Sequence, residues 1–192
     1  MRKSFFVIQA FISFLFIGII TLQAQQTQGK KKAVCIAFYN TENLFDTIDD
    51  PLTDDKEFLP DGANQWNTSK YMEKLNHLAE VISQIGDDYV KGGPTVLGLS
   101  EIENRRVLED LVKMPELSKQ GYAIIHFDSP DNRGVDVALI YKYHVFKVSS
   151  ARAVPLHIPD MPNFKTRDQL VVSGMIEGEM LHFIVNHWPS RF

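Results

Sequence analysis

The sequence predicts an α/β domain in which a mixed β-sheet is covered by helices on one side. Buried strands and amphipathic helices alternate over residues 33–115, and only strand patterns follow over residues 122–185. No further helix is available to cover the late strands, which would leave one face of their sheet bare. We therefore expect a second sheet to pack on that face.

The first predicted element is a buried strand at residues 33–39. Its apolar run includes Val34 and Ile36 and is too short for a core helix. Residues 46–66 follow as a long acidic loop without the spacing of a calcium-binding loop. A loop of this length is either a lid on the substrate side or solvated irregular structure, and the sequence leaves both open.

The first helix is predicted at residues 69–85, where apolar side chains recur three and four residues apart. Thr68 or Ser69 can cap its first turn, and Gly86 can end it. This helix therefore has one apolar face to lay on the sheet.

A second buried strand is predicted at residues 95–100. A second helix then begins at Asn104 or Arg105 and stops before Pro115, because proline cannot continue a helix. The last two strands form a hairpin across residues 177–179. The later strand patterns cover residues 122–127, 135–141, 145–148, 170–176 and 180–185.

The N-terminus has the layout of a secretory signal peptide over residues 1–24. Arg2 and Lys3 precede an almost purely apolar run at residues 5–20, and Ala24 is a small residue at which cleavage can occur. The run is slightly shorter than the about 20 apolar residues of a membrane-spanning helix. An uncleaved membrane anchor is the alternative, but we expect cleavage and export, with no stable membrane anchor left.

The rest of the chain divides into a polar linker at residues 25–32 and one domain at residues 33–192. The net charge of −4 at pH 7 argues against constitutive, high-affinity binding of duplex nucleic acid. The only cysteine, Cys35, lies in an apolar run, where it is interpreted as a small buried residue rather than a nucleophile. We expect an exported enzyme, periplasmic or extracellular, that contacts phosphate only locally, and we infer no partner protein.

Polar side chains follow three of the predicted strands at their C-terminal ends. They are Asn40, Glu101 and the pair Asn186 and His187. Open α/β sheets place their ligand crevice at this edge. An Asn and a Glu supply hard oxygen ligands for Mg²⁺ or Mn²⁺, and an imidazole supplies a donor for a phosphate oxygen. Each residue alone also fits a turn or an exposed surface position, so the joint pattern carries the interpretation.

Four segments containing these residues resemble the endonuclease/exonuclease/phosphatase superfamily with the deoxyribonuclease-I-like fold, and they look closest to its secreted bacterial branch. They occur in the family's order and span nearly all of the predicted mature chain. The resemblance implies a four-layer α/β/β/α sandwich, of which this chain holds roughly the first half. The four segments are residues 38–46, 97–104, 133–141 and 185–191.

The resemblance also implies a role for each matching position. Glu101 would be the principal ligand of Mg²⁺ or Mn²⁺, with Asn40 beside it, and Glu42 lies where some relatives place a further acidic ligand. His187 would donate to the scissile phosphate and stabilise the charge that builds on its oxygens. These four residues form the expected catalytic and metal-binding group.

Further positions are expected to orient this group or to bind substrate. Asp136 would orient His187 by accepting from its other ring nitrogen, and Arg133 would contact phosphate or pair with an acidic neighbour. A structural ion pair at a strand start is the alternative for both residues. Asn186 and Arg191 would bind the substrate phosphate.

The chain departs from the family in lacking its Gly-Asp-x-Asn and final Ser-Asp-His segments. These segments supply the residues expected to activate the attacking water and to hold the leaving oxygen. We therefore expect a C-terminally truncated domain that hydrolyses very weakly or not at all by itself. We also expect the missing half to supply the second sheet.

The expected function is a metal-dependent phosphoric ester hydrolase, a phosphodiesterase or nuclease. Its substrate would be a phosphodiester in nucleic acid, in a phospholipid headgroup or in a small molecule. Three alternatives stay open: a non-catalytic remnant or phosphate-binding module, an exported lipid or sugar phosphatase of the same fold, and a membrane-anchored interaction protein.

Overall fold

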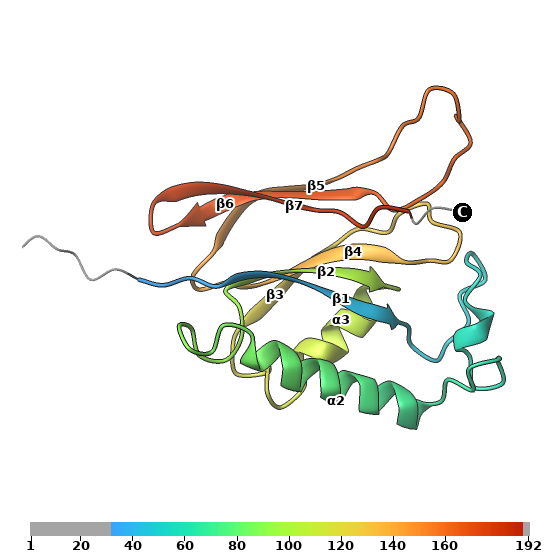
Figure 1. Ribbon diagram of the computed structural model, residues 1–192, viewed down its shortest axis with the longest axis horizontal. Helices are drawn as coiled ribbons and strands as arrows, with labels where there is room; N and C mark the ends of the chain where they lie inside the picture. Colours follow the sequence, from blue (N-terminus) through green and yellow to red (C-terminus); the bar gives the residue numbers. More distant parts are fainter. Residues whose placement is uncertain (1–31, 190–192) are drawn as a thin grey trace, which may run out of the picture. The chain divides into compact units, whose positions relative to one another are not determined.

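Two β-sheets lie face to face in the structure, a computed structural model, and two helices cover the outer face of the first sheet (Figure 1). The structure describes residues 32–189. Apart from the first two, these belong to the compact unit Val34–Phe192. The predicted signal peptide, the predicted linker up to residue 31, and Arg191 lie outside the described residues.

The first sheet has four strands in the order β1-β2-β4-β3. Strand β1 pairs with β2 in parallel, and the other two pairs are antiparallel. A parallel pair requires a long crossover connection, which here contains the first helix. The strands are β1 (Ile36–Leu44), β2 (Val96–Ile102), β3 (Tyr122–His126) and β4 (Asp136–Lys142).

Helix α2 (Thr68–Gln84) occupies the predicted stretch almost residue for residue. Its N-cap is Asn67, one residue before the predicted caps, because the Asn67 side chain accepts from the backbone N–H of Lys70. Gly86 follows its end with φ +74, and a Cβ there would lie 2.5 Å from Cys35 Sγ. The helix therefore ends where only glycine fits.

Helix α3 (Arg105–Val112) begins where the sequence predicted it. Asn104 caps it by accepting from the backbone N–H of Val107. Its buried face, made of Val107, Leu108 and Leu111, packs beside α2 on the same face of the sheet. Both helices thus bury their apolar sides against one surface.

The second sheet is antiparallel and has the order β5-β6-β7. It corrects two expectations. The strand predicted at residues 145–148 starts at Lys147 and runs on to Val154, because polar residues on its solvent side conceal the pattern. The second sheet was expected from the missing half of the domain. It is instead formed by β5, β6 and β7 of this chain, while β3 and β4 belong to the first sheet. The strands are β5 (Lys147–Val154), β6 (Gln169–Ile176) and β7 (Glu179–Val185).

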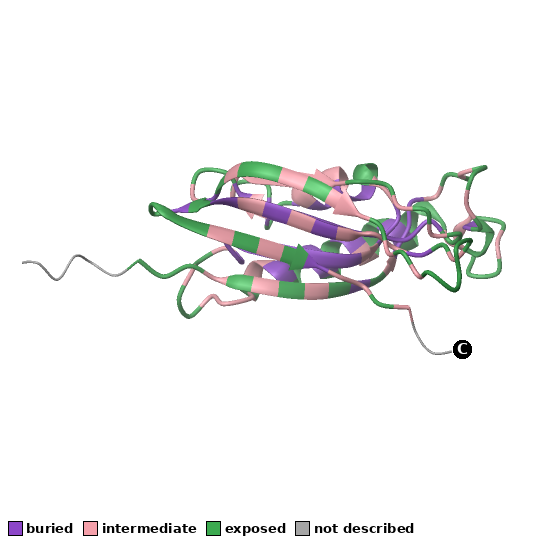
Figure 2. Ribbon diagram, turned by 90° about the horizontal axis from the view of Figure 1, so that it is seen from above, coloured by how far each residue is buried: buried purple, intermediate pink, exposed green. Residues whose placement is uncertain are grey.

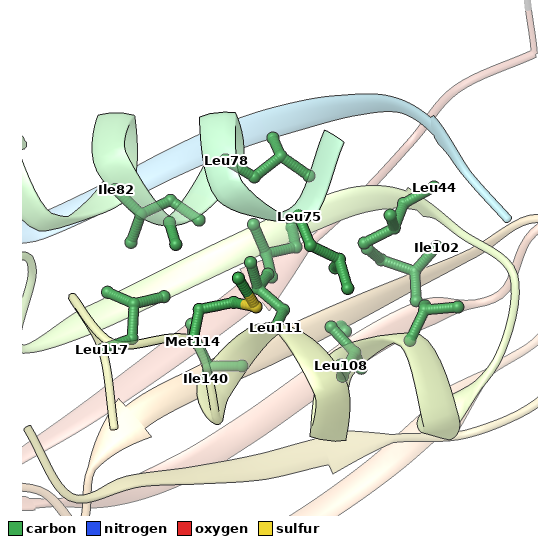
Figure 3. Close-up of a cluster of buried hydrophobic side chains, with 14 of the residues drawn as sticks. Leu44, Leu75, Leu78, Ile82, Ile102, Leu108, Leu111, Met114, Leu117 and Ile140 are labelled. Atoms are coloured by element: carbon green, nitrogen blue, oxygen red, sulfur yellow. The ribbon is translucent and has the colours of Figure 1, made fainter. Parts of the chain in front are cut away.

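Two apolar cores hold these layers together. One lies between the helices and the first sheet, where Leu75, Leu111 and Ile140 meet (Figure 3). The other lies between the sheets and includes Phe146 and Val172. More and less buried residues alternate along β6 (Figure 2), as expected for a sheet with one covered face, whereas β2 and β4 are buried almost throughout.

The outer face of the second sheet is apolar at several positions. Met180 and Ile184 on β7 are exposed there. Within residues 32–189, no helix covers this face, so three of the four expected layers are described. None of the described helices is both long and apolar enough to cross a bilayer.

Phe146 is the largest fully buried side chain in the core between the two sheets. Its ring is fully buried, meets Phe183 edge-on at 5.2 Å, and would lie 2.5 Å from a Cβ on Gly174. We expect Phe146→Ala to lower the free energy of unfolding by about 3–5 kcal/mol, measured by urea denaturation. Tyr89→Ala, at a residue 83% exposed, is the control and should change it by less than about 0.5 kcal/mol. Equal effects of the two substitutions would contradict the assigned core.

Candidate functional site

The C-terminal ends of β1 and β2 lie at one edge of the first sheet, where several loops gather (Figure 1). The loop after β1 contacts the loop of residues 127–135, through a hydrogen bond from the Asp54 N–H to the Asn132 carbonyl. The loop of residues 155–168 joins them through an ion pair, and residues 186–189 follow β7 to the same edge. Segments far apart in the sequence thus form one rim.

The backbone is irregular where β1 and β2 reach this rim. Regular pairing ends at Asn40 and Ser100, and the register then shifts. Glu42, Asn43 and Glu101 adopt φ values of 57°, 61° and 61°, which side chains rarely tolerate. Each such residue costs about 1–3 kcal/mol, and strain of this kind gathers at functional sites.

The C-terminal ends predicted for the first two strands are wrong, because β1 and β2 continue through the irregular stretch. Strand β1 continues to Leu44, so Asn40 lies inside it rather than after it, and Glu101 lies inside β2. The Thr41 hydroxyl donates to the carbonyls of Ser100 and Glu101, both at 2.9 Å, and so ties the two bulges together. The two strands extend past their predicted ends because these hydrogen bonds hold their irregular ends together.

The carboxylate of Glu101 is the meeting point of the site. Its Oε1 accepts from Asn40 Nδ2 at 3.1 Å and lies 3.3 Å from His187 Nε2. Its Oε2 accepts from the backbone N–H of Asn43 at 2.9 Å. The side chain is 17% exposed, so it stays accessible. The structure therefore brings Asn40, Glu101 and His187 together.

The donor set at this point fits a hard divalent cation. Glu101 offers an accessible carboxylate, and Asn40 Oδ1, which accepts from the backbone N–H of Glu42 at 2.8 Å, keeps a second lone pair. Mg²⁺ commonly uses one or two carboxylates and keeps several waters.

The backbone carbonyl of Glu42 accepts from Lys74 Nζ at 2.6 Å. Burial lowers the pKa of Lys74, and the charges of Glu42 and Glu101 oppose that shift.

A second cluster at the same edge contains His126, Asp128 and Asp136, with ligand atoms within 4.8 Å of one another. Both ring nitrogens of His126 face carboxylates: Nε2 lies 3.0 Å from Asp136 and Nδ1 lies 3.7 Å from Asp128. Asp136 also accepts from the backbone N–H and the hydroxyl of Ser129. Because its partners already use the carboxylate of Asp136, we interpret the cluster as a latch on the loop of residues 127–135.

The partner expected for Asp136 is therefore wrong. Asp136 was expected to orient His187, but it binds His126, while His187 faces Glu101. The antiparallel pairing of β3 and β4 places the end of one beside the start of the other, which brings His126 to Asp136. Burial raises the pKa of Asp136, and the hydrogen bonds from His126 and Ser129 oppose that shift.

Two arginines and one acid border His187. Arg133 is half exposed and lies 3.9 Å from Asp131, so it pairs with an acidic neighbour as one of its two expectations stated. Arg167 is 9% exposed and lies 3.4 Å from the other oxygen of Asp131. Neither Arg167 nor Asp131 is among the site residues predicted from the sequence. The predicted hairpin could have indicated Arg167. Pairing Leu170 with Val185 brings the residues before β6 beside those after β7.

The charge balance around His187 favours its neutral form. Burial lowers its pKa, and the positive charges of Arg167 and Arg133 lower it further, while Glu101 and Asp131 oppose the shift. A neutral imidazole carries a proton on one ring nitrogen and a lone pair on the other. Near neutral pH, His187 can therefore donate one hydrogen bond into the site.

The acidic loop of residues 46–66 packs on this edge through its own carboxylates and contains one 3₁₀ turn, Lys56–Phe58. Asp46 and Asp55 are buried, and the Asp46 N–H donates to the buried carboxylate of Glu103 at 2.6 Å. Burial and the neighbouring carboxylates raise the pKa of Glu103 to about 8. The loop is irregular structure, and a role as a lid stays a prediction.

Several buried side-chain atoms near the site lack a hydrogen-bond partner among the described residues. They include Oδ1 of Asn186, Oδ1 of Asp168, Oγ of Ser100 and Nε of Arg167. Burial raises the pKa of Asp168, and the charge of Asp136 adds to the shift. Such orphaned atoms are uncommon in folded proteins and are typical of positions where a ligand, an ion or water completes the structure.

Comparison with known proteins agrees with this architecture. A family model described as "Endonuclease/Exonuclease/phosphatase family" matches residues 35–192. No match was found among curated proteins. A structure of D. rerio TDP2, humanized by 14 mutations, superposes with a TM-score of 0.52 at 13% identity over 82% of this chain and 48% of that chain. This likeness shows the fold, and the predicted deoxyribonuclease-I-like fold is confirmed.

Two structures from Bacteroides thetaiotaomicron are similar at lower scores. An endonuclease/exonuclease/phosphatase family protein has 16% identity and a TM-score of 0.49 over 79% of this chain and 48% of that chain. The mannosyl-6-phosphatase Bt3783 has 15% identity and a TM-score of 0.49 over 79% and 50%. The chain thus spans about half the length of the solved structures it matches.

Removing the carboxylate of Asp136 tests the interpretation of the latch. Asp136→Ala leaves three part-buried donors without their acceptor, and we expect it to lower the free energy of unfolding by about 2–5 kcal/mol in urea titrations. Asp136→Asn keeps one acceptor oxygen and should cost less. Asp128→Ala, at a side chain 91% exposed, is the control and should cost less than about 1 kcal/mol. If Asp136→Ala were as mild as the control, the latch would be refuted.

Proposed function

The chain belongs to the Endonuclease/Exonuclease/phosphatase family, and from that premise we propose that it supplies part of the active site of a metal-dependent phosphoric ester hydrolase. One observation carries the proposal. The Glu101 carboxylate, held at a strained bulge of β2, meets the Asn40 amide and the His187 imidazole within 3.3 Å. A carboxylate, an amide and a neutral imidazole at one sheet edge suit a metal-assisted attack on a phosphoester.

Each of these side chains has a proposed task. Glu101 and Asn40 would hold Mg²⁺ or Mn²⁺, and a bound ion of this kind supplies Lewis-acid stabilisation of a phosphoryl oxygen. Glu42 is kept as a candidate ligand, because its backbone lies at the same bulge. Glu101 anchors the Asn40 amide and the Asn43 N–H and so fixes the position of the bulge.

His187 and Arg167 would contact the phosphate itself. The N–H of neutral His187 would donate to a phosphate oxygen, and the guanidinium of Arg167 would stabilise the charge that develops on these oxygens in the transition state. Asp131 holds Arg167 from the other side at 3.4 Å. With its low exposure, Arg167 needs little further ordering when a phosphate binds.

Hydrolysis is proposed for the whole protein that carries this chain. The chain spans about half the length of the structures it matches, and among residues 32–189 we assign no residue to activating the attacking water. We propose that this group lies outside the described part and that the 192-residue chain alone hydrolyses very weakly or not at all. The proposed substrate is a phosphodiester or a small phosphoester.

Export is part of the proposal and rests on the apolar run near the N-terminus. Cleavage after Ala24 would release the domain into the periplasm or the extracellular medium. Mass spectrometry of the exported protein should give an N-terminus at Gln25. A mass that retains residues 5–20 would instead support the membrane-anchored alternative.

Glu101→Gln tests the metal assignment in the whole protein. It keeps the shape of the side chain and removes its charge, so we expect kcat/KM for a phosphoester in Mg²⁺ to fall by about 100-fold or more. Wild-type activity should disappear with a chelator and return with Mg²⁺ or Mn²⁺. Glu116→Gln, at an exposed residue after α3, is the matched control. Full chelator-sensitive activity in Glu101→Gln would refute the assignment of Glu101 as a metal ligand.

His187→Gln tests the donor to the phosphate. Loss of a transition-state donor lowers kcat by about 10²–10³-fold and changes KM little. Steady-state kinetics with the same substrate separate the two parameters. A rise in KM with an unchanged kcat would assign His187 to ground-state binding instead.

A further inference from the structure

A basic hollow of about 360 Å³ lies beside the proposed active site. Its walls come from the loop of residues 127–135, the loop of residues 155–168, and Pro189 after β7. This volume falls within the about 300–1,000 Å³ that is typical of small-molecule sites. The proposed metal site does not occupy it.

The lining of the hollow is positive although the chain carries a net charge of −4. Arg133, Lys165 and Arg167 line it together with one carboxylate, that of Asp131. Asp131 lies between the two arginines, at 3.9 and 3.4 Å, and balances one positive charge. Two positive charges are therefore left uncompensated within the lining.

The two remaining cations are available to a ligand. Lys165 is exposed, and its ammonium makes no ion pair or hydrogen bond with the residues that the structure describes. Arg133 is 53% exposed and touches Asp131 only at the outer limit of an ion pair. An exposed Arg and an exposed Lys that face one hollow are a combination that binds phosphate.

The hollow lies near His187 in the fold. Arg167 lines it and also lowers the pKa of His187, and the charge of Arg133 reaches His187 as well. Pro189 is two residues beyond His187 in the chain. A group held in the hollow therefore lies on the same side of the fold as His187 and near it.

We propose that this hollow binds a second phosphate group of the substrate, adjacent to the phosphoester that is hydrolysed. The proposal rests on the proposed function, which places the scissile group at Glu101 and His187. Arg133 and Lys165 determine specificity by contacting the second phosphate, while Arg167 borders both positions. Two substrate classes carry two phosphates in this way: a single nucleic acid strand and a bisphosphorylated small molecule.

Binding calorimetry on the whole protein, in chelator and without added metal, tests the proposal without hydrolysis. One arm compares thymidine 3′,5′-bisphosphate with thymidine 5′-monophosphate, and the other compares fructose 1,6-bisphosphate with fructose 6-phosphate. We expect the bisphosphate to bind about tenfold or more tightly than the monophosphate in at least one arm. The arm that shows the preference identifies the source of the second phosphate.

Variants then locate the preference. The double variant Arg133→Gln/Lys165→Gln should abolish the preference for the bisphosphate over the monophosphate. Lys119→Gln/Lys147→Gln is the matched control. It removes the same charge at the other ends of β3 and β5 and should keep the preference. Circular dichroism confirms that both variants are folded.

The outcomes separate this inference from the proposed function. Equal affinities for bisphosphate and monophosphate in both arms overturn the hollow as a phosphate site. So does a preference that survives in Arg133→Gln/Lys165→Gln, or one that the control variant loses equally. A wild-type protein that prefers bisphosphates but hydrolyses no phosphoester in Mg²⁺ or Mn²⁺ would instead refute the proposed function and leave the site standing.

Discussion

The parallel pairing of β1 with β2, and the way it breaks down, is the constraint on which the site depends. The pairing is regular up to Asn40 and Ser100, and the bulges beyond carry Glu101 at φ 61°. The Thr41 hydroxyl and the Glu101 carboxylate both hydrogen-bond across the break and hold it in place. A strained backbone persists only where its surroundings overdetermine it, and here these contacts do so.

The second sheet completes the site from the opposite direction. Because β6 and β7 form a tight hairpin, the start of one and the end of the other lie side by side. This brings Arg167 beside His187, and Asp131 holds Arg167 in turn. The apolar contact around Phe146 fixes the second sheet on the first and so sets the approach of His187 to Glu101. Packing in the core and charge at the rim are therefore linked.

Carboxylates hold the loops at the rim, together with aromatic contacts in the acidic loop. Asp136 fastens one loop through His126 and Ser129, and Glu103 fastens the acidic loop through the backbone of Asp46. Buried carboxylates of this kind are costly unless donors satisfy them, which is why each collects several partners or keeps its proton. These buried carboxylates thus serve the framework of the rim, while Arg133 and Lys165 line the hollow.

The sequence by itself determined the helices, most strands and the three polar positions Asn40, Glu101 and His187, because apolar periodicity and strand ends are local signals. It could not assign partners across the fold. The pairing of Asp136 with His126, the place of Arg167 beside His187 and the division of the late strands between two sheets arise from strand order and hairpin register. These are contacts between residues distant in the chain, so only the tertiary structure decided them.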